Sequence, residues 1–298
     1  MSIFKVSKIM NRYIIAELNI KMAIFGKILK DQSRAYQSLI SPEKYKFEFR
    51  SDQDSIRIEG NIIQKTKEKI ISETIDKWIF YRKEDKILKI QKIYYKNNNN
   101  AEFRYRELLK KYPLLKFDDY EYINTGFAFS RALLDYNGFC LHSSAVALDN
   151  KAVLFSAPCG TGKSTHTGLW RKYFGEDKAI IINDDKPAIR LMGDTFYVYG
   201  TPWSGKSDLN TNAKVPLQAI VFLEQASENC IERLSNKDAV RWLYYQSLRP
   251  TGPRSEEKTS NLLNLLDKIV CQIPIYKMGC TISEEAVELS YNTTILGK

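Results

Sequence analysis

The sequence predicts a mixed α/β protein, α+β overall, with a mainly antiparallel β domain at residues 1–125 and an α/β domain at residues 126–298. Two observations lead to this prediction. The hydrophobic period changes from two to about 3.6 after a polar asparagine run at residues 97–100. Further along, an order of strand, loop, helix and strand begins at residue 152, which is typical of an α/β layer.

The first part of the chain alternates apolar and polar residues, as strands with one solvated face do. A turn is expected at Gly60-Asn61, and a charged turn follows Tyr81. This pattern predicts an antiparallel meander, and it contains no residues with an obvious catalytic role. The expected strands are residues 45–49, 55–59, 78–81 and 87–93.

The second part begins with two expected helices, residues 101–111 and 122–136, the second ended by Asn137-Gly138. Residues 139–148 read as one extended segment, and Asp149-Asn150 is a turn signal before the next strand. The remaining apolar strands are expected at residues 152–155, 179–182 and 219–223, and the remaining helices at residues 163–174, 236–247 and 257–270.

The composition excludes several classes of protein. The chain has five cysteines without a CxxC pair and only two histidines, which argues against a disulfide framework, a zinc ribbon and a histidine metal site. No apolar run reaches the ~18 residues of a membrane span, so we expect a cytoplasmic protein with no membrane partner. The net charge is +10, but the lysines are dispersed rather than clustered, so no nucleic-acid partner is expected.

The chemistry is concentrated in one loop. Residues Ala157, Pro158, Cys159, Gly160, Thr161, Gly162, Lys163, Ser164 and Thr165 match the phosphate-binding (Walker A) pattern G-x-x-x-x-G-K-[ST], with Ala157 in place of the first glycine. Gly160 and Gly162 let successive N–H groups face one anion, and the positive end of the next helix adds to that field. Lys163 is expected to reach the outer phosphates, and the Ser164 hydroxyl to ligate Mg²⁺.

A pair of carboxylates, Asp184 and Asp185, follows the strand that comes after this loop and helix. One carboxylate can hold Mg²⁺, and the other can accept the proton of an attacking hydroxyl. The alternative is that the pair only caps a turn before Pro187.

The loop together with His142 and Asn183-Asp184-Asp185 resembles the kinase domain of the HPr kinase/phosphorylase family, and through it the nucleotide-binding part of ATP-dependent phosphoenolpyruvate carboxykinase. The resemblance covers roughly residues 139–224. It departs from the family at Ala157 and Cys159 and lacks the segment that recognises HPr, which implies a relative with a different acceptor. Kinases of that family can assemble into homo-oligomers.

The resemblance implies roles by position. Lys163 binds the phosphates, Ser164 and Asp185 bind Mg²⁺, and Asp184 is the general base. His142 aligns with a family histidine near the transferred phosphate, so it is expected on a strand and near the proton transfer. The alternative is a hydrogen-bonded core histidine.

Two further segments are candidates for completing the site. Lys206, on a glycine-flanked loop, could close over the γ-phosphate, and Trp203 in the same loop could exclude water, unless it simply packs on the core. Arg249 and Arg254 could clamp a phosphate or an acidic acceptor.

These features together predict an ATP-dependent kinase with ATP and Mg²⁺ as cofactors. The predicted partners are a nucleotide and a hydroxyl-bearing acceptor, which is either a serine of a peptide or protein or a small molecule. The alternatives are a carboxykinase-like phosphotransferase and a non-catalytic nucleotide sensor. Residues 1–125 are expected to select the acceptor or to serve a structural role.

Overall fold

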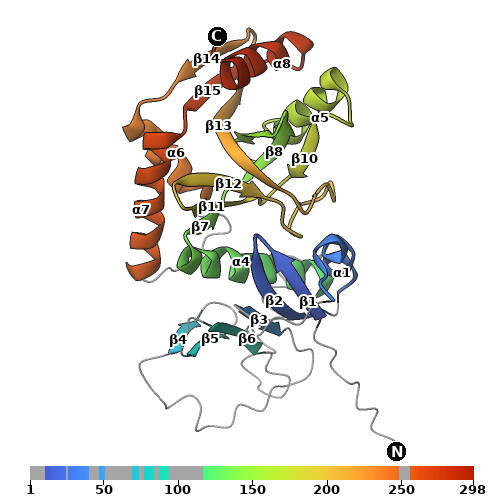
Figure 1. Cartoon of the computed structure of the whole chain (residues 1–298), viewed down its shortest axis with the longest axis vertical. Coiled ribbons are helices and arrows are strands. Elements are labelled where there is room, and N and C mark those ends of the chain that lie inside the picture. The colour runs from blue at the N-terminus through green and yellow to red at the C-terminus, as the bar shows by residue number, and fades with distance from the viewer. Residues whose placement is uncertain are drawn as a thin grey trace, which may run out of the picture. The chain divides into compact units, whose positions relative to one another are not determined.

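The computed structural model describes residues 11–24, 26–39, 47–50, 69–73, 77–83, 87–93, 117–247 and 256–298 (Figure 1). The chain divides into two compact units, Met1–Ala128 and Phe129–Lys298. Helix α4 (Phe117–Leu133) continues across that boundary. Among the described helices, none is both long enough and apolar enough to span a bilayer.

The first unit contains a mixed six-stranded sheet in the order β1-β2-β3-β6-β5-β4. Strands β4, β5 and β6 form an antiparallel meander, in which β5 and β6 were expected and β4 was not. Strand β3 runs parallel to both of its neighbours, so the expectation of a mainly antiparallel sheet holds only in part. The described elements are β1 (Asn11–Ile15), β2 (Leu18–Ala23), α1 (Lys27–Gln32), a 3₁₀ helix (Arg34–Tyr36), β3 (Phe47–Arg50), β4 (Lys69–Glu73), β5 (Lys77–Lys83) and β6 (Ile87–Ile93).

The hairpin of β1 and β2 was not among the predicted strands. Its turn places Ala16 and Glu17 at positive φ. Tyr13 and Ile15 are buried on one face of the hairpin, as alternate strand residues are. The expected strand at residues 55–59 and the expected helix at residues 101–111 lie outside the described residues.

The second unit is a mixed α/β layer built on one curled sheet. Its elements are a 3₁₀ helix (Leu134–Tyr136), β7 (Gly138–Cys140), β8 (Ser143–Leu148), β9 (Lys151–Ser156), α5 (Lys163–Phe174), β10 (Ile180–Asn183), β11 (Ala188–Met192), β12 (Thr195–Tyr199), β13 (Lys214–Gln225), β14 (Cys230–Arg233), α6 (Asn236–Ser247), α7 (Glu256–Gln272), β15 (Ile275–Cys280), α8 (Glu284–Tyr291) and a π-helical turn (Asn292–Leu296).

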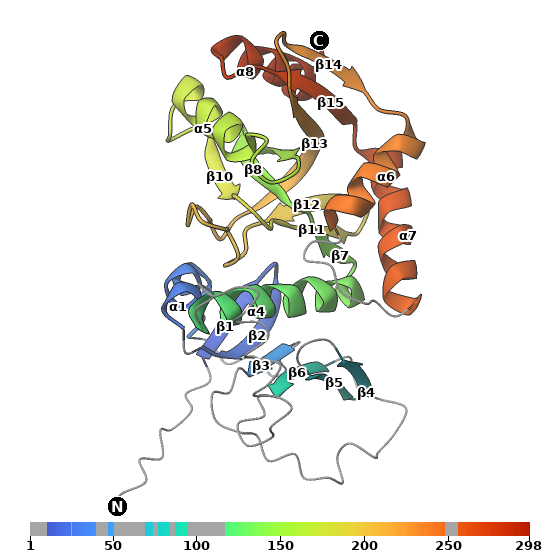
Figure 2. The ribbon, with the colours of Figure 1, turned by 180° about the vertical axis from the view of Figure 1, so that it is seen from behind.

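Strand β13 produces the curl because its two halves pair with different neighbours. Its first residues pair antiparallel with β12, and its later residues pair parallel with β9 and β15 (Figures 1 and 2). Since β9, β13 and β15 are parallel, their carboxyl ends lie at one edge of the sheet. The loop that follows β9 therefore opens at that edge, where parallel strands commonly place ligand sites.

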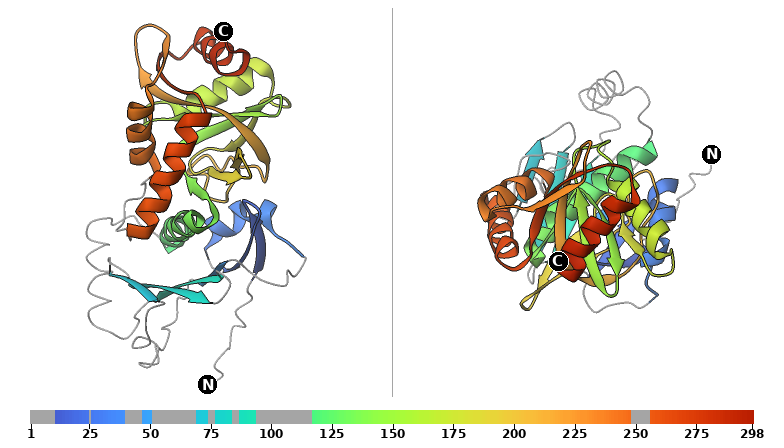
Figure 3. Two further views of the ribbon diagram at one scale, coloured as in Figure 1. Left: turned by 60° about the vertical axis from the view of Figure 1, so that its left-hand side comes forward. Right: turned by 90° about the horizontal axis from the view of Figure 1, so that it is seen from above.

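Helices cover both faces of this sheet. Helices α5 and α8 pack on one face, where Val153 and Phe155 of β9 are buried. Helices α6 and α7 pack on the other, where the alternating residues Ala152 and Leu154 are buried. In Figure 3 the dark red α8 lies beside the yellow-green α5. Burial on both faces explains why these strands read as continuous apolar runs.

The structure corrects the boundaries around residue 142. The expected extended segment at residues 139–148 is two strands: β7 pairs with β11, whereas β8 pairs with β9 and β10. His142 lies in the bend between them rather than on a strand. The expected turn at Asp149 and Asn150 is confirmed, since both have positive φ in the β8–β9 hairpin.

Candidate functional site

The loop between β9 and α5 has the backbone of an anion-binding turn. Gly160 has φ +83° and Gly162 has φ +121°, and a Cβ at either position would meet no atom within 4 Å. The glycines are therefore required by backbone conformation and not by crowding. Pro158, Cys159 and Gly160 are exposed, so the turn is open to a ligand beside the positive end of α5.

Lys163 lies over this turn. Its Nζ donates hydrogen bonds to the carbonyl oxygens of Ala157 at 3.0 Å and Pro158 at 3.2 Å, and the residue is 8% exposed. These acceptors are neutral, so they compensate the buried ammonium less well than an anion would. An incoming phosphate would thus meet a cation already held at the loop, with Ser164 and Thr165 exposed nearby.

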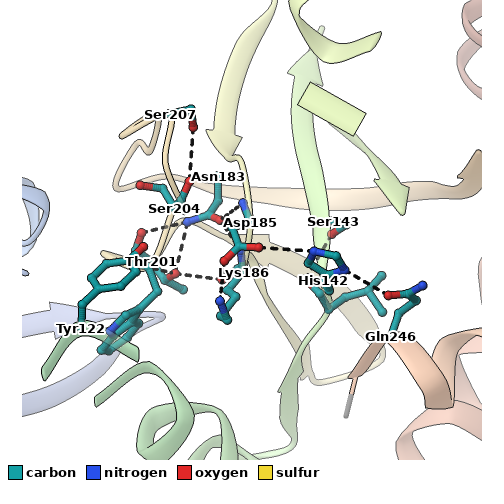
Figure 4. A network of polar contacts seen from close by, with 12 residues as sticks. Tyr122, His142, Ser143, Asn183, Asp185, Lys186, Thr201, Ser204, Ser207 and Gln246 are labelled. Atoms are coloured by element: carbon teal, nitrogen blue, oxygen red, sulfur yellow. Dashed lines mark hydrogen bonds and ion pairs between the residues drawn. The ribbon is translucent and has the colours of Figure 1, made fainter. Parts of the chain in front are cut away.

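The carboxylate pair sits on a turn that Asn183 holds in one conformation, and Figure 4 shows Asn183 beside the second carboxylate, Asp185. The buried Asn183 accepts hydrogen bonds through Oδ1 from the backbone N–H of Asp185 at 2.9 Å and of Lys186 at 2.6 Å. Its Nδ2 donates to the carbonyl oxygen of Thr201 at 2.8 Å. Each polar atom of this amide is used, so the turn has little freedom to move the two carboxylates.

Asp184 is connected to the helix of the anion-binding loop. Ser144 on β8 donates its Oγ proton to Asp184 Oδ1 at 2.6 Å, and the same Oγ lies 2.8 Å from Oγ1 of Thr167 on α5. Thr167 is one turn after Ser164. Asp184, Ser144 and Thr167 are all buried, so this short chain of hydrogen bonds positions the carboxylate relative to the loop.

Asp185 faces in a different direction, toward His142 and Lys186 (Figure 4). His142 Nε2 lies 3.5 Å from Asp185 Oδ1, and Lys186 forms an ion pair with Oδ2. The other ring nitrogen of His142, Nδ1, lies 3.0 Å from Oε1 of Gln246 on α6. The resemblance implied a general base at Asp184 and a position for His142 near the proton transfer; in the structure the aspartate beside His142 is Asp185.

The loop at residues 200–206 packs on this second carboxylate. Gly205 has φ +74°, and a Cβ there would lie 3.0 Å from Asp185 Cβ, so its backbone approaches the carboxylate closely. Lys206 is exposed on the same loop. Trp203 is only 1% exposed and stacks on Phe129 with ring centroids 4.9 Å apart, so the reading of this tryptophan as core packing is the one that fits.

Arg249 and Arg254 lie outside the described residues. The sequence reading did not single out Ser144, Thr167, Lys186 or Gln246. Two adjacent serines after a histidine and a threonine on the loop helix were visible signals for the first two. Gln246 is 104 residues from His142 along the chain, so only the fold brings the two together.

The second histidine, His166, packs in the interior. It lies against Phe155 with ring centroids 4.5 Å apart, and its Nε2 is 3.1 Å from Ser290 Oγ. That hydroxyl donates to the carbonyl oxygen of Val287 and receives the indole N–H of Trp170, so the histidine must supply a proton through Nε2. Burial lowers the pKa of His166 to about 4.

This burial predicts an acid-sensitive fold. An unfolded histidine has a pKa of about 6.5, so the unfolded chain binds more protons than the folded chain between about pH 6.5 and about pH 4. The contribution of this neutral, buried histidine to the free energy of unfolding is fully present above about pH 6.5 and is lost as the pH falls toward about 4. Urea unfolding measures the free energy of unfolding at each pH. Between about pH 7.5 and about pH 4.5, this free energy should fall by about 2 to 3 kcal/mol more in wild type than in His166→Gln. Equal losses in the two proteins would contradict the prediction.

The described residues at this site offer a magnesium ion a few oxygen donors. Among the described residues no group of three or more His, Cys, Asp or Glu side chains could hold a metal. A nucleotide-bound Mg²⁺ takes only one or two carboxylates, the other ligands being phosphate oxygens and water. The carboxylate of Asp184 and the hydroxyl of Ser164 are donors of that kind, so the residues present are suited to such an ion.

No curated protein matches this chain. Among solved structures, an HPr(Ser) kinase/phosphatase from Coxiella burnetii is similar over 50% of this chain and 90% of its own, with 14% identity and a TM-score of 0.27. That TM-score is too low to equate the two folds. The family model described as SynChlorMet cassette protein ScmC matches residues 127–288. Because this match covers more than half of the 298 residues, the chain belongs to the ScmC family.

Proposed function

We propose that this protein is an ATP-dependent phosphotransferase that transfers the γ-phosphate to a hydroxyl group. One observation carries the proposal: the buried chain of hydrogen bonds from Thr167 through Ser144 to Asp184 ties a carboxylate to the helix of an open, glycine-containing anion loop. A loop that only connected a strand to a helix would need no such link. Phosphoryl transfer depends on this kind of alignment of phosphate, cation and carboxylate.

In the proposed reaction the loop N–H groups and Lys163 bind the phosphates of ATP. Asp184 and Ser164 are the residues that would hold Mg²⁺, which offsets phosphate charge when it is bound with the nucleotide. Asp185 accepts the proton of the acceptor hydroxyl while that oxygen forms its bond to the γ-phosphorus and ADP leaves. This exchanges the two aspartate roles that the resemblance implied.

Lys186 and His142 orient the Asp185 carboxylate. The Lys186 ammonium pairs with Oδ2, while Oδ1 faces His142. The carboxylate is therefore held with Oδ1 on the side of the histidine. The exposed Lys206 follows Gly205, whose backbone touches Asp185, so its ammonium is the candidate to close over the transferred phosphate.

The test is incubation of the purified chain with γ-labelled ATP, Mg²⁺ and three sets of acceptors: serine-containing peptides, small alcohols and small carboxylates. Label recovered as a phosphate ester of a hydroxyl is the expected result. Label on a carboxylate acceptor would favour the carboxykinase-like alternative. Binding of ATP without transfer to any acceptor or to water would favour a nucleotide sensor and contradict the proposal.

A further inference from the structure

His142 is held by Gln246 at two points. The backbone N–H of His142 donates to the carbonyl oxygen of Gln246 at 3.1 Å, and His142 Nδ1 lies 3.0 Å from Oε1 of the same residue (Figure 4). Gln246 is 5% exposed and lies near the end of α6. Because Gln246 is buried and contacts His142 through both its backbone carbonyl and its side-chain amide, it restricts the position and the rotation of the histidine ring.

The contact also determines which ring nitrogen carries a proton. An amide oxygen only accepts hydrogen bonds, so Nδ1 of His142 must be the donor. The hydrogen bond made by one ring nitrogen sets the state of the other, and a neutral ring with a proton on Nδ1 has a lone pair on Nε2. That Nε2 is the nitrogen that lies 3.5 Å from Asp185 Oδ1.

We propose that Gln246 is a positioning residue that holds His142 with Nδ1 protonated and Nε2 directed at Asp185, so that His142 can take over the proton that Asp185 accepts. The inference rests on the proposed function. In this step the O–H bond of protonated Asp185 breaks and an N–H bond forms at Nε2. Asp185 returns to a carboxylate, and His142 becomes an imidazolium whose two N–H groups face Gln246 and Asp185.

The amide is suited to this task because it carries no charge. A carboxylate at position 246 would also accept from Nδ1, but its negative charge would stabilise the imidazolium, whereas the neutral amide holds Nδ1–H without adding charge. An apolar side chain there would leave Nδ1 without the acceptor on α6. Among the contacts that the described residues show, Nδ1 of His142 lies beside the neutral amide and Nε2 lies beside Asp185, which is itself paired with Lys186.

The first experiment determines which nitrogen of the His142 ring carries a proton. The chain has only two histidines, so nitrogen NMR of the imidazoles gives two sets of signals, which His166→Gln assigns. At alkaline pH, without nucleotide, wild-type His142 should be protonated on Nδ1. Gln246→Met should move the proton largely to Nε2, the nitrogen that carries it in a free imidazole. Gln246→Glu keeps an acceptor at this position and should restore Nδ1–H. Gln272→Met, the same change at an exposed position of α7, should alter nothing.

The second experiment measures transfer from γ-labelled ATP to water and to hydroxyl acceptors. Gln246→Met should lower the turnover rate at least about tenfold while the affinity for Mg·ATP stays within about twofold. If wild type transfers phosphate but Nδ1 of His142 carries no proton, the inference fails and the proposed function stands. If wild type transfers none, the proposed function fails and the proton relay fails with it.

Discussion

Replacing Lys163 with alanine is expected to reduce phosphate transfer from ATP by about a hundredfold or more. The ammonium is the cation already held against the loop carbonyls of Ala157 and Pro158, where the outer phosphates are proposed to bind. Losing one preorganised electrostatic contact of this kind costs about 3 kcal/mol in the transition state. The measurement is the rate of label transfer from γ-labelled ATP at saturating Mg²⁺.

The matched control is Lys172→Ala, which removes an exposed lysine from the same helix without touching the loop. Its transfer rate should stay close to that of wild type. Thermal unfolding should show that both variants keep the fold, since the Lys163 ammonium donates its hydrogen bonds to the loop carbonyl oxygens of Ala157 and Pro158. A Lys163→Ala protein with full activity would remove the basis of the proposed function.

Replacing Asp185 with asparagine is expected to lower turnover about 10²- to 10⁴-fold, the usual contribution of a general base, and to leave Mg·ATP affinity nearly unchanged. Asp184→Asn should instead weaken the affinity for Mg·ATP more than it lowers turnover. The reason is that Asp184 is linked to the helix of the loop by its hydrogen bond with Ser144, which contacts Thr167. Calorimetric titration gives the affinities, and single-turnover transfer gives the rates.

Asparagine matches aspartate in shape, so each variant acts as the steric control for the other. The opposite pattern, with Asp184→Asn abolishing turnover and Asp185→Asn weakening Mg²⁺-dependent binding, would restore the roles implied by the family resemblance. Equal and complete retention of activity in both variants would exclude the turn at residues 183–186 from the reaction.

The elements that local patterns define were predicted well. Helix α5 begins at Lys163 because Gly162 precedes it at positive φ, and the β8–β9 turn follows from Asp149 and Asn150. The strands that pair with distant partners were predicted less well. The parallel pairing of β3 depends on contacts far along the chain, and a period of two is the same for parallel and antiparallel strands.

The candidate site likewise has parts that the local sequence predicts and parts that depend on the fold. A short motif predicted the anion loop, and a carboxylate pair after the next strand predicted the two aspartates, because both signals depend on neighbours in sequence. Which aspartate faces the histidine could not be predicted, since the direction of each side chain is determined by Asn183, Ser144 and the break between β7 and β8. The sequence left two roles open for Trp203, water exclusion at the site and core packing, and its stacking on Phe129 places it in the core.

The amino-acid order by itself determined where a phosphate-binding turn can form, because glycine conformation and a helix start are local properties. Only the tertiary structure decided how that turn meets its partners: α6 brings Gln246 to His142, and β8 brings Ser144 between Asp184 and Thr167. Both contacts join residues separated by tens of positions or more. Their geometry therefore depends on how the sheet curls and how its helices pack, which no local pattern encodes.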